Sequence, residues 1–393
     1  MMADRFGAIT GIGQSEIGRP SKRSAMQLTV DAALEAMRDA GLKAADIDGI
    51  ACWPGDNDNG NPFSPVGPLA LKSVLGLETR WYGGGYEAPG PLAALIHAAM
   101  AVASGLCRHV LVFRTITEAS ARLADRNAAS LANKTTGRDG SYFWQWYTPF
   151  NVRSAVNLIA MYAQRHFHEY GTTSEQLGWI PVTLRQHAAL NPKAIYRDPL
   201  TIEAYLASRI ISSPLRLLDC DVHCDASTAM IVSAPDAARD RPNRPIRIEA
   251  IGSALSQPWS WDQISLTEMA TADVGRMLWS ETDYRPSDVH TAQLYDGFSI
   301  LTLMWLEGLG FCSKGEGGSF VEGGVRIRRD GQLPLNTNGG QLSGGRTHGL
   351  GYVHEACTQL WARAGDRQIS KHDVAVCSAG GGPLGGAVLL VRE

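Results

Sequence analysis

The sequence predicts a layered α/β protein made of two similar halves. In the first half, a glycine cluster at 83–85 precedes an apolar segment that ends at Gly105, and the apolar run 110–113 follows. Small and apolar residues cover nearly the whole circumference of a helix over that segment, so we expect the helix to be buried between layers. Glycine-rich turns stand beside an apolar helix and a strand again between 339 and 391. The repeated order predicts a duplicated architecture.

The composition is typical of a folded protein whose partners are neither nucleic acids nor membranes. The 393 residues are 44% apolar and 19% charged, and they include 10 Trp. The net charge is −3 and the basic residues are scattered, so no basic patch faces phosphate backbones or anionic lipids. The longest apolar stretch, 91–106, is shorter than the roughly 20 residues of a membrane-spanning helix. The N-terminus shows no secretory leader pattern, which predicts a cytoplasmic location.

The first half, residues 1–240, is expected to combine an α/β core with a helical insertion. Apolar residues around Gly11 and Gly13 predict a first strand and turn over 6–17. Ser24 is a suitable N-cap for a helix that ends near Gly41. Residues 114–214 lack a strand pattern and carry many aromatic residues, which indicates a helical loop region over the core. The other elements predicted for this half are strands at 47–53, 110–113 and 229–233 and a helix at 66–75.

The second half, residues 241–393, alternates strands and helices after a connector at 236–245. Its predicted strands are 246–251, 292–295, 374–377 and 387–391, and its predicted helices are 299–309 and 354–364. This alternation is typical of α/β proteins.

The cysteines predict neither a disulfide framework nor a structural metal. The seven cysteines are odd in number and widely spaced in a large chain. Cys220 and Cys224, with His223 between them, could form half of a zinc site, but no second ligand pair at zinc spacing follows.

Two glycine-rich turns are candidates for binding a ligand through backbone N–H groups. One contains Asn338, Gly339 and Gly340, and the other contains Gly381 and Gly382. Glycines allow the close backbone approach that an oxyanion or phosphate site requires, but tight turns explain the same composition. Neither turn ends in the Gly-Lys-Ser/Thr of a phosphate-binding P-loop.

A third candidate is the junction at 293–299, where an apolar strand meets the start of a helix. Side chains at the carboxyl end of a strand in an α/β sheet point toward the crevice where ligands bind. Tyr295 and Asp296 stand at that place. Alternatively, Tyr295 belongs to the core, and Asp296 or Ser299 caps the helix.

These segments together resemble the thiolase-like proteins related to the sterol carrier protein x thiolase. The stretches 295–299, 306–312 with 315–318, 336–340, 348–351 and 380–386 follow the family's order at near its spacing. The resemblance implies a thiolase fold of two similar five-stranded sheet and helix halves in an α/β/α/β/α arrangement, with a loop region over the active site. It also implies a homodimer.

The chain departs from the degradative thiolases at the nucleophile. Alignment of the turn before Gly90 with the family's nucleophile motif places Glu87 at the position of the catalytic cysteine, and no cysteine lies between Cys52 and Cys107. Without a thiolate no acyl-enzyme forms, so we do not expect thiolysis or Claisen condensation.

Other catalytic positions of the thiolases also differ. Tyr295 replaces a family histidine. His348 or Arg346 takes the place of the later catalytic histidine, and Cys377 or Ser378 takes that of the late catalytic cysteine.

This pattern is similar to the steroid side-chain aldolases, a thiolase-fold subfamily. The resemblance implies that Tyr295 and Tyr352 are catalytic in the retro-aldol cleavage of a β-hydroxyacyl-CoA. An example is a 17-hydroxy steroid with a three-carbon thioester side chain, which yields a 17-ketosteroid and propionyl-CoA. The subfamily works with a small OB-fold, zinc-ribbon protein, which this chain does not encode. CoA is then part of the substrate, and no permanently bound cofactor is expected.

The residues suit that chemistry. A retro-aldol step needs a base for the β-hydroxyl proton, donors for the enolate oxygen and an acid for the α-carbon, but no nucleophile. One tyrosine is expected to act as base and the other as acid, with Asp296 and His348 orienting them and the glycine turns donating to the enolate. The aromatic run 142–150 either lines an apolar substrate cavity or packs in the core or an interface.

Two other functions remain open at this point. An acyltransferase would use Ser378 or Cys377 as its nucleophile, and a non-catalytic protein would only bind a lipid or an acyl-CoA. The body of the substrate could be a steroid, a bile acid or an aromatic thioester.

Overall fold

The computed structural model describes residues 6–55, 61–84, 92–129, 147–152, 154–255 and 265–393. In these residues a nine-stranded mixed sheet runs in the order β3-β2-β4-β7-β1-β8-β11-β10-β9. The first half supplies β1 (Ala8–Gln14), β2 (Gly49–Cys52), β3 (Trp81–Gly83), β4 (His109–Thr117) and β7 (Asp225–Ser233). The second half supplies β8 (Ile246–Leu255), β9 (Thr291–Gln293), β10 (Val374–Gly381) and β11 (Leu384–Arg392). The halves meet where β1 pairs antiparallel with β8.

The two halves repeat the same strand pairing. In the first half, β3 and β4 pair parallel with β2, β4 pairs antiparallel with β7, and β7 pairs antiparallel with β1. In the second half, β9 pairs parallel with β10, β10 antiparallel with β11, and β11 antiparallel with β8. A parallel bridge between Ala292 and Leu335 stands where the first half has β3. The predicted fold class is confirmed, and the fifth strand of the second half is reduced to this bridge.

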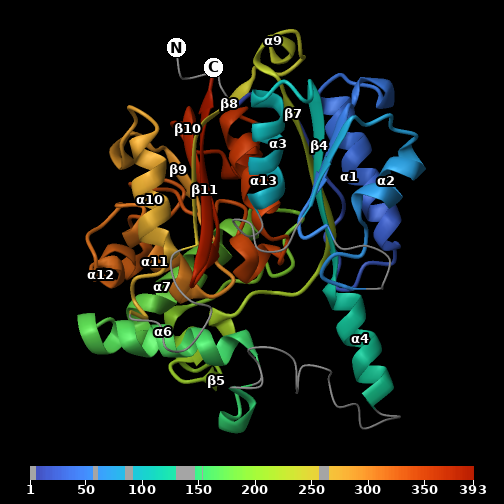
Figure 1. The fold of residues 1–393 in the computed structure, drawn as a ribbon. Helices are drawn as coiled ribbons and strands as arrows, with labels where there is room; N and C mark the ends of the chain where they lie inside the picture. The colour runs from blue at the N-terminus through green and yellow to red at the C-terminus, as the bar shows by residue number, and fades with distance from the viewer. Residues whose placement is uncertain (1–5, 56–60, 85–91, 130–146, 153, 256–264) are drawn as a thin grey trace.

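Helices form three layers, and the two halves of the sheet lie between these layers. α3 (Ala93–Ala103) and α13 (Gly349–Leu360) lie side by side in the central layer (Figure 1). The outer layers contain α1 (Ala25–Asp39) and α2 (Pro68–Leu75) on one side, and α10 (Ala270–Ser280) and α11 (Ser299–Gly308) on the other. Along β4, Val110 and Val112 pack into the central core, whereas Leu111 and Phe113 pack into the outer core of the first half. The strand therefore buries both faces, as its unbroken apolar run requires.

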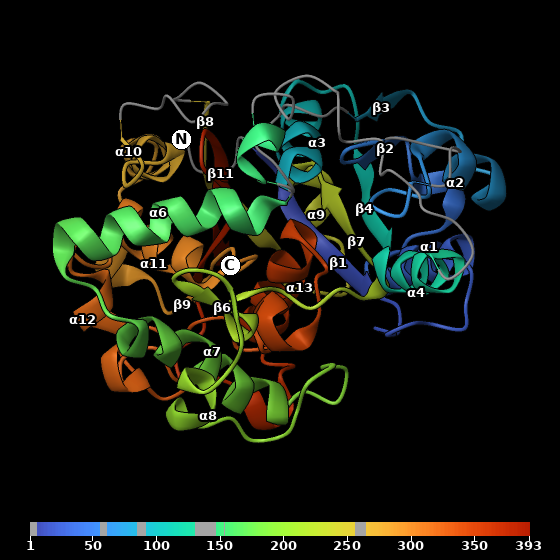
Figure 2. The ribbon, with the colours of Figure 1, turned by 90° about the horizontal axis from the view of Figure 1, so that it is seen from below.

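A helical region lies below the sheet, as predicted for 114–214. α4 (Glu118–Ala129) leaves the lower edge directly after β4, and α6 (Ala155–Tyr170), α7 (Ser174–Ala189) and α8 (Ile202–Leu206) lie below the second half (Figures 1 and 2). β4 extends into this region as far as Thr117, and a small hairpin of β5 (Ile210–Ser212) and β6 (Leu215–Arg216) follows the helices. Short α-helices elsewhere in the described ranges include α9 (Pro235–Ala238) and α12 (Gly317–Val321).

A buried carboxylate connects this helical region to the second half. Glu307 of α11 lies 2.9 Å from Nε2 of His166 in α6 and 3.1 Å from the Lys314 ammonium. The Gly317 N–H donates to the same carboxylate at 3.1 Å. Burial alone would raise the pKa of Glu307, but these partners hold it below its usual value. The charged contact therefore holds α6 against α11.

Gly11 and Gly13 lie inside β1, so the predicted turn at these residues is wrong. A Cβ on Gly13 would lie 2.2 Å from the Ala32 carbonyl oxygen and 2.6 Å from the Ala36 nitrogen of α1. Gly11 has the same kind of close contact with Ala36 and Ala40. These glycines therefore let α1 pack backbone to backbone against the strand.

Gly13→Ala should destabilise the protein by about 3 kcal/mol or more, because neither backbone can move without disrupting the core. Gly76→Ala is the control: Gly76 has a left-handed φ of +64° and nothing within 4 Å of its Cβ position, so only about 1 kcal/mol is expected. Chemical denaturation measures both. Equal losses would contradict the close-packing argument.

Candidate active site

Tyr295 lies just beyond the carboxyl end of β9, beside the parallel strand β10. Its backbone N–H donates to Oγ of Ser378 in β10 at 3.2 Å. The neighbouring Cys377 faces the opposite side, where its sulfur lies 3.7 Å from the Tyr352 carbonyl oxygen in the central core. Burial raises the pKa of the Cys377 thiol. Of the two residues left open from the sequence, Ser378 is therefore the one beside Tyr295.

The turn after Leu335 is joined to the end of β9 by one amide side chain. Asn336 accepts from the Leu294 N–H at 2.7 Å and donates to the Leu294 carbonyl at 2.8 Å. This pair of bonds imitates strand pairing beyond β9 and places the turn against Asp296. A Cβ on Gly340, which has a φ of +58°, would lie 2.0 Å from Oδ2 of Asp296. Glycine is required there because of both the space and the backbone conformation.

Asp296 is fully buried, and three donors hold its carboxylate. Its carboxylate accepts from the Gln341 N–H at 2.9 Å, the Leu342 N–H at 3.2 Å and the Tyr352 hydroxyl at 2.5 Å. The Tyr352 oxygen in turn accepts from the Asp296 N–H at 2.9 Å and from Nε2 of Gln341 at 2.5 Å. The predicted orienting contact of Asp296 therefore exists, and it is made to Tyr352.

These contacts shift three pKa values. Burial raises the pKa of Asp296 to about 6, although its hydrogen bonds to Tyr352, Gln341 and Leu342 oppose the change. Burial, and then the charge of Asp296, raise the pKa of Tyr352 well above its usual value. Burial also raises the pKa of Tyr295 to about 12, while the nearby Arg346 cation acts in the lowering direction. Both tyrosines are therefore protonated at neutral pH, and of these three groups Asp296 has the pKa closest to neutral.

The two tyrosines differ in what their hydroxyls contact. Their rings meet edge to face with centroids 6.3 Å apart. Tyr352 is 2% exposed and its oxygen has a full set of hydrogen bonds. Tyr295 is partly buried, and in the described part of the chain its hydroxyl has no hydrogen-bond partner. Tyr295 is therefore the tyrosine that can contact a ligand directly.

A charged cluster from both halves lies beside Tyr295. The Arg346 guanidinium lies 3.0 Å from Oδ2 of Asp221, 3.5 Å from Oε2 of Glu118 at the start of α4, and 3.2 Å from Nε2 of His223. Arg346 also donates to Nε2 of His348 at 3.1 Å. Burial raises the pKa of Asp221 to about 6 against the effect of Arg346, and burial lowers that of His223 to about 3. Arg346 and His348 therefore share one site, so both alternatives for the family histidine lie within it.

Phe63, a residue of the first half, packs against this cluster. Its ring meets the His348 ring edge to face at 4.8 Å, and the Arg114 guanidinium stacks over it at 4.2 Å. Arg114 also donates to the Trp53 carbonyl at 2.7 Å. His348, expected to orient a tyrosine, instead bonds Arg346 through its ring and Gln341 through its backbone N–H.

Backbone N–H groups of the two glycine turns are less available to a ligand than the sequence suggested. The Gly339 N–H donates to the Asn336 carbonyl at 2.9 Å, and the Gly340 N–H donates to the Asn338 side chain at 2.9 Å. Gly381 and Gly382 lie at the hairpin between β10 and β11, where the Gly382 N–H lies 3.1 Å from the Met269 sulfur. These N–H groups are therefore already bonded, so their predicted role toward a substrate oxygen stays a prediction.

Some predicted residues lie outside the described ranges, and others were missed. Glu87 and most of the aromatic run 142–150 lie outside them. Sequence reasoning missed Glu118, Asp221, Gln341 and Phe63. Glu118 directly follows a strand, and Asp221 is close to His223 in the sequence. Both positions are weak signals of a functional residue.

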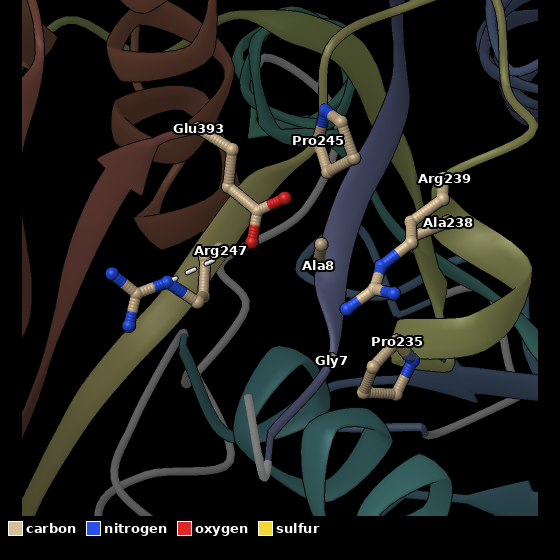
Figure 3. A pocket seen from close by; sticks show the side chains of 8 residues that line it. All are labelled: Gly7, Ala8, Pro235, Ala238, Arg239, Pro245, Arg247 and Glu393. Atoms are coloured by element: carbon tan, nitrogen blue, oxygen red, sulfur yellow. Dashed lines mark ion pairs between the residues drawn. The ribbon is translucent and has the colours of Figure 1, made fainter. Parts of the chain in front are cut away.

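Away from this site, the described residues include a cavity of about 560 Å³ beside α6, lined by Asn157, Met161 and His168 among others. In the described residues, no cluster of three His, Cys, Asp or Glu side chains could hold a metal ion. No helix in the described ranges is long and apolar enough to cross a membrane. A pocket at the junction of the halves, lined by Gly7, Arg247 and Glu393 among others (Figure 3), holds about 10 Å³, which is room for about one water molecule.

The raised pKa of Asp296 predicts a pH-dependent stability. Since the folded pKa of about 6 lies above the unfolded value of about 3.9, the folded state binds the proton more tightly. The free energy of unfolding should therefore fall as pH rises from about 4 to about 6, with a contribution from this group on the order of 3 kcal/mol. Asp296→Asn should remove that contribution, as measured by denaturation at several pH values. An unchanged slope in the variant would contradict it.

Comparisons with known proteins find relatives that match nearly the whole chain. The thiolase C-terminal domain-like family matches residues 252–392. A 17-hydroxy-3-oxo-4-pregnene-20-carboxyl-CoA lyase of Mycobacterium tuberculosis is 36% identical over 97% of this chain and 98% of the relative. A steroid side-chain-cleaving aldolase of Thermomonospora curvata is 34% identical over 97% of each chain. The solved structure of an Ltp2-ChsH2(DUF35) aldolase is similar with a TM-score of 0.87 and 32% identity, over 100% of this chain and 98% of that chain.

Proposed function

Because this chain belongs to the thiolase-like steroid side-chain-cleaving aldolases, we propose that it cleaves a β-hydroxyacyl-CoA by a retro-aldol reaction. The protein is a carbon–carbon lyase that acts on a CoA thioester. The substrate is a 17-hydroxy steroid with a three-carbon CoA side chain, and the products are a 17-ketosteroid and propionyl-CoA. CoA enters as part of the substrate, and no permanently bound cofactor is required.

The free hydroxyl of Tyr295 is the observation that carries this proposal. In the reaction the β-hydroxyl loses its proton, the carbon–carbon bond breaks, and its electron pair moves into the thioester to form an enolate. The α-carbon of the enolate then takes up a proton. Tyr295, whose hydroxyl has no partner in the described residues and whose pKa is about 12, is a protonated acid suited to supply it.

The pair of Tyr352 and Asp296 is suited to accept the hydroxyl proton. Asp296 is a buried carboxylate with a pKa of about 6, and Tyr352 donates to it at 2.5 Å. Tyr352 can pass its proton to Asp296 while it accepts the proton of the substrate, provided that Gln341 releases its oxygen. The Asp296 N–H, which keeps its bond to that oxygen, would stabilise the phenolate that forms on the way.

The structure offers less support for an acyltransferase. Cys377 lies in the central core with a raised thiol pKa, so it is a poor nucleophile. Ser378 accepts a hydrogen bond from the Tyr295 backbone, and no histidine donates to or accepts from its hydroxyl among the described contacts. A serine without a base is not activated for attack.

Tyr295→Phe should lower kcat by about a hundredfold to ten-thousandfold, because it removes the acid and leaves the ring packing intact. Tyr284→Phe is the matched control, since Tyr284 packs against the outer core of the second half. Release of propionyl-CoA from the steroid thioester measures both variants. Wild-type rates in Tyr295→Phe would exclude Tyr295 as the acid.

A second copy of the chain and a separate small protein are proposed as partners. β3 is a three-residue edge strand that pairs only with β2 in the described sheet, and Tyr82 in it is 75% exposed. Such an edge can pair with the same edge of a second chain. The similar aldolase was solved with ChsH2(DUF35), which supports a separate partner of the small OB-fold, zinc-ribbon type. We further propose that the protein is cytoplasmic and that a domain boundary lies near residue 240.

Co-expression with such a partner should increase the yield of soluble protein and the rate of cleavage. The expected product is a complex that co-elutes in size-exclusion chromatography with two copies of each chain. A stable homodimer that is fully active alone would contradict the need for the partner.

A further inference from the structure

A second buried carboxylate, that of Glu355, lies behind the active site. Glu355 follows Tyr352 by three residues in α13 and is 1% exposed. Its carboxylate accepts from the Arg367 guanidinium at 2.9 and 3.1 Å and from Nε2 of Gln359 at 3.0 Å. The Thr337 hydroxyl donates to it at 2.8 Å. These groups keep their places, because the loss of a partner would leave a buried charge uncompensated.

The Thr337 hydroxyl connects this carboxylate to two elements of the site. Thr337 is fully buried in the turn that contacts Asp296. Its oxygen also accepts from Nε2 of Gln293 at 3.2 Å and from Nε2 of Gln359 at 3.0 Å. Gln293 is the last residue of β9, two residues before Tyr295. With one donated and two accepted bonds, the hydroxyl joins β9, the turn and α13 at a single point.

The hydroxyl acts on the site through the turn. Among the contacts of the described residues, Thr337 and Glu355 bond neither Asp296 nor a tyrosine. The Gln341 and Leu342 N–H groups, which hold the Asp296 carboxylate, lie four and five residues after Thr337 in the same turn. Displacement of Thr337 would therefore displace these donors. A shift of about 1 Å that begins far from the reacting atoms can lower a rate about a hundredfold.

Separate contacts fix the other side of the turn. Arg185 of α7 donates to Oγ of Ser343 at 2.8 Å, and Asn191, just beyond that helix, donates to the Asn338 carbonyl at 2.9 Å. These bonds hold the turn against the helical region, whereas the Thr337 bonds hold it against α13 and β9. Loss of the Thr337 hydroxyl should therefore shift the turn without unfolding it.

We propose that the Thr337 hydroxyl, held by Glu355, is a positioning group that keeps the backbone donors of its turn on the Asp296 carboxylate during the retro-aldol reaction. The inference rests on the proposed function and adds two positioning residues to it. Thr337 and Glu355 contact no substrate and transfer no proton in this role. The proton of the substrate hydroxyl still passes to Tyr352 and Asp296.

The pH dependence of the reaction should report this role. The two backbone donors of the turn lower the pKa of Asp296 against the effect of its burial, so weaker donors should let that pKa rise above about 6. Asp296 accepts a proton only as a carboxylate, so the acidic limb of kcat should then move to higher pH. Asp296 also acts electrostatically on Tyr352, Tyr295 and Asp221. Both tyrosines stay protonated in this range, and Asp296→Asn distinguishes the titration of Asp296 from that of Asp221.

Thr337→Val in the full chain is the first test, because it replaces the hydroxyl with a methyl group of similar size. The kcat for the steroid thioester should fall about 10- to 100-fold with KM nearly unchanged, and the acidic limb should move up by about one pH unit. Thr337→Ser, which keeps the hydroxyl, should restore both.

Thr358→Val is the matched control. Thr358 is also buried, and its hydroxyl donates at 2.8 Å to the His354 carbonyl of its own helix. Its kcat and acidic limb should equal those of the wild type. If Thr337→Val only lost stability, with the same kcat and the same limb as the control, the hydroxyl would be a structural group and the inference would be overturned.

Carbon-13 NMR of the chain labelled at its aspartate carboxyl carbons tests the inference without any cleavage. Asp296→Asn identifies the signal of Asp296. Thr337→Val should raise the pKa of Asp296 by about one unit, and Thr337→Ala takes its place if the valine variant does not fold. An unchanged pKa would overturn the inference. A raised pKa in a protein whose wild type cleaves no steroid thioester would count against the proposed function alone.

Discussion

The buried carboxylate of Asp296 is the interaction on which the site depends. It joins three separate segments: the turn between β9 and α11, the glycine turn at 336–344, and the start of α13 through Tyr352. A carboxylate buried without partners would cost several kcal/mol, so each of these segments must keep its place. Tyr295 precedes Asp296 in the chain, and its position follows from the same contacts. Gly340 is required because any side chain there would collide with the carboxylate.

The fold and part of the site follow from local sequence patterns. The apolar runs predicted the strands, and the glycine-rich turns before apolar helices predicted the duplicated halves, because these signals lie within a few residues of one another. The pair of Tyr295 and Asp296 at the end of a strand was predictable for the same reason. Their contact with Tyr352 came from the family resemblance, since nothing local links residues 56 positions apart.

Other features could not be read from the sequence because they depend on long-range packing. Gly13 looks like a turn residue, but it lies in β1 because α1 packs against its backbone. Glu118 and Asp221 reach Arg346 only when the halves come together. The glycines at 339 and 340 suggested an oxyanion site, yet their N–H groups close the turn itself and bring the Gln341 and Leu342 donors to Asp296. The glycine-rich turn therefore binds a carboxylate of the protein itself, that of Asp296.

Carbon–carbon cleavage in this protein is expected to form no covalent intermediate, which mass spectrometry can detect. The full chain, co-expressed with the proposed small partner, is incubated with a 17-hydroxy steroid three-carbon CoA thioester, with no free CoA added. The expected products are propionyl-CoA and the 17-ketosteroid in equal amounts, with the protein at its unmodified mass. An acyl adduct on Ser378, or an intact thioester that stays bound, would contradict this expectation.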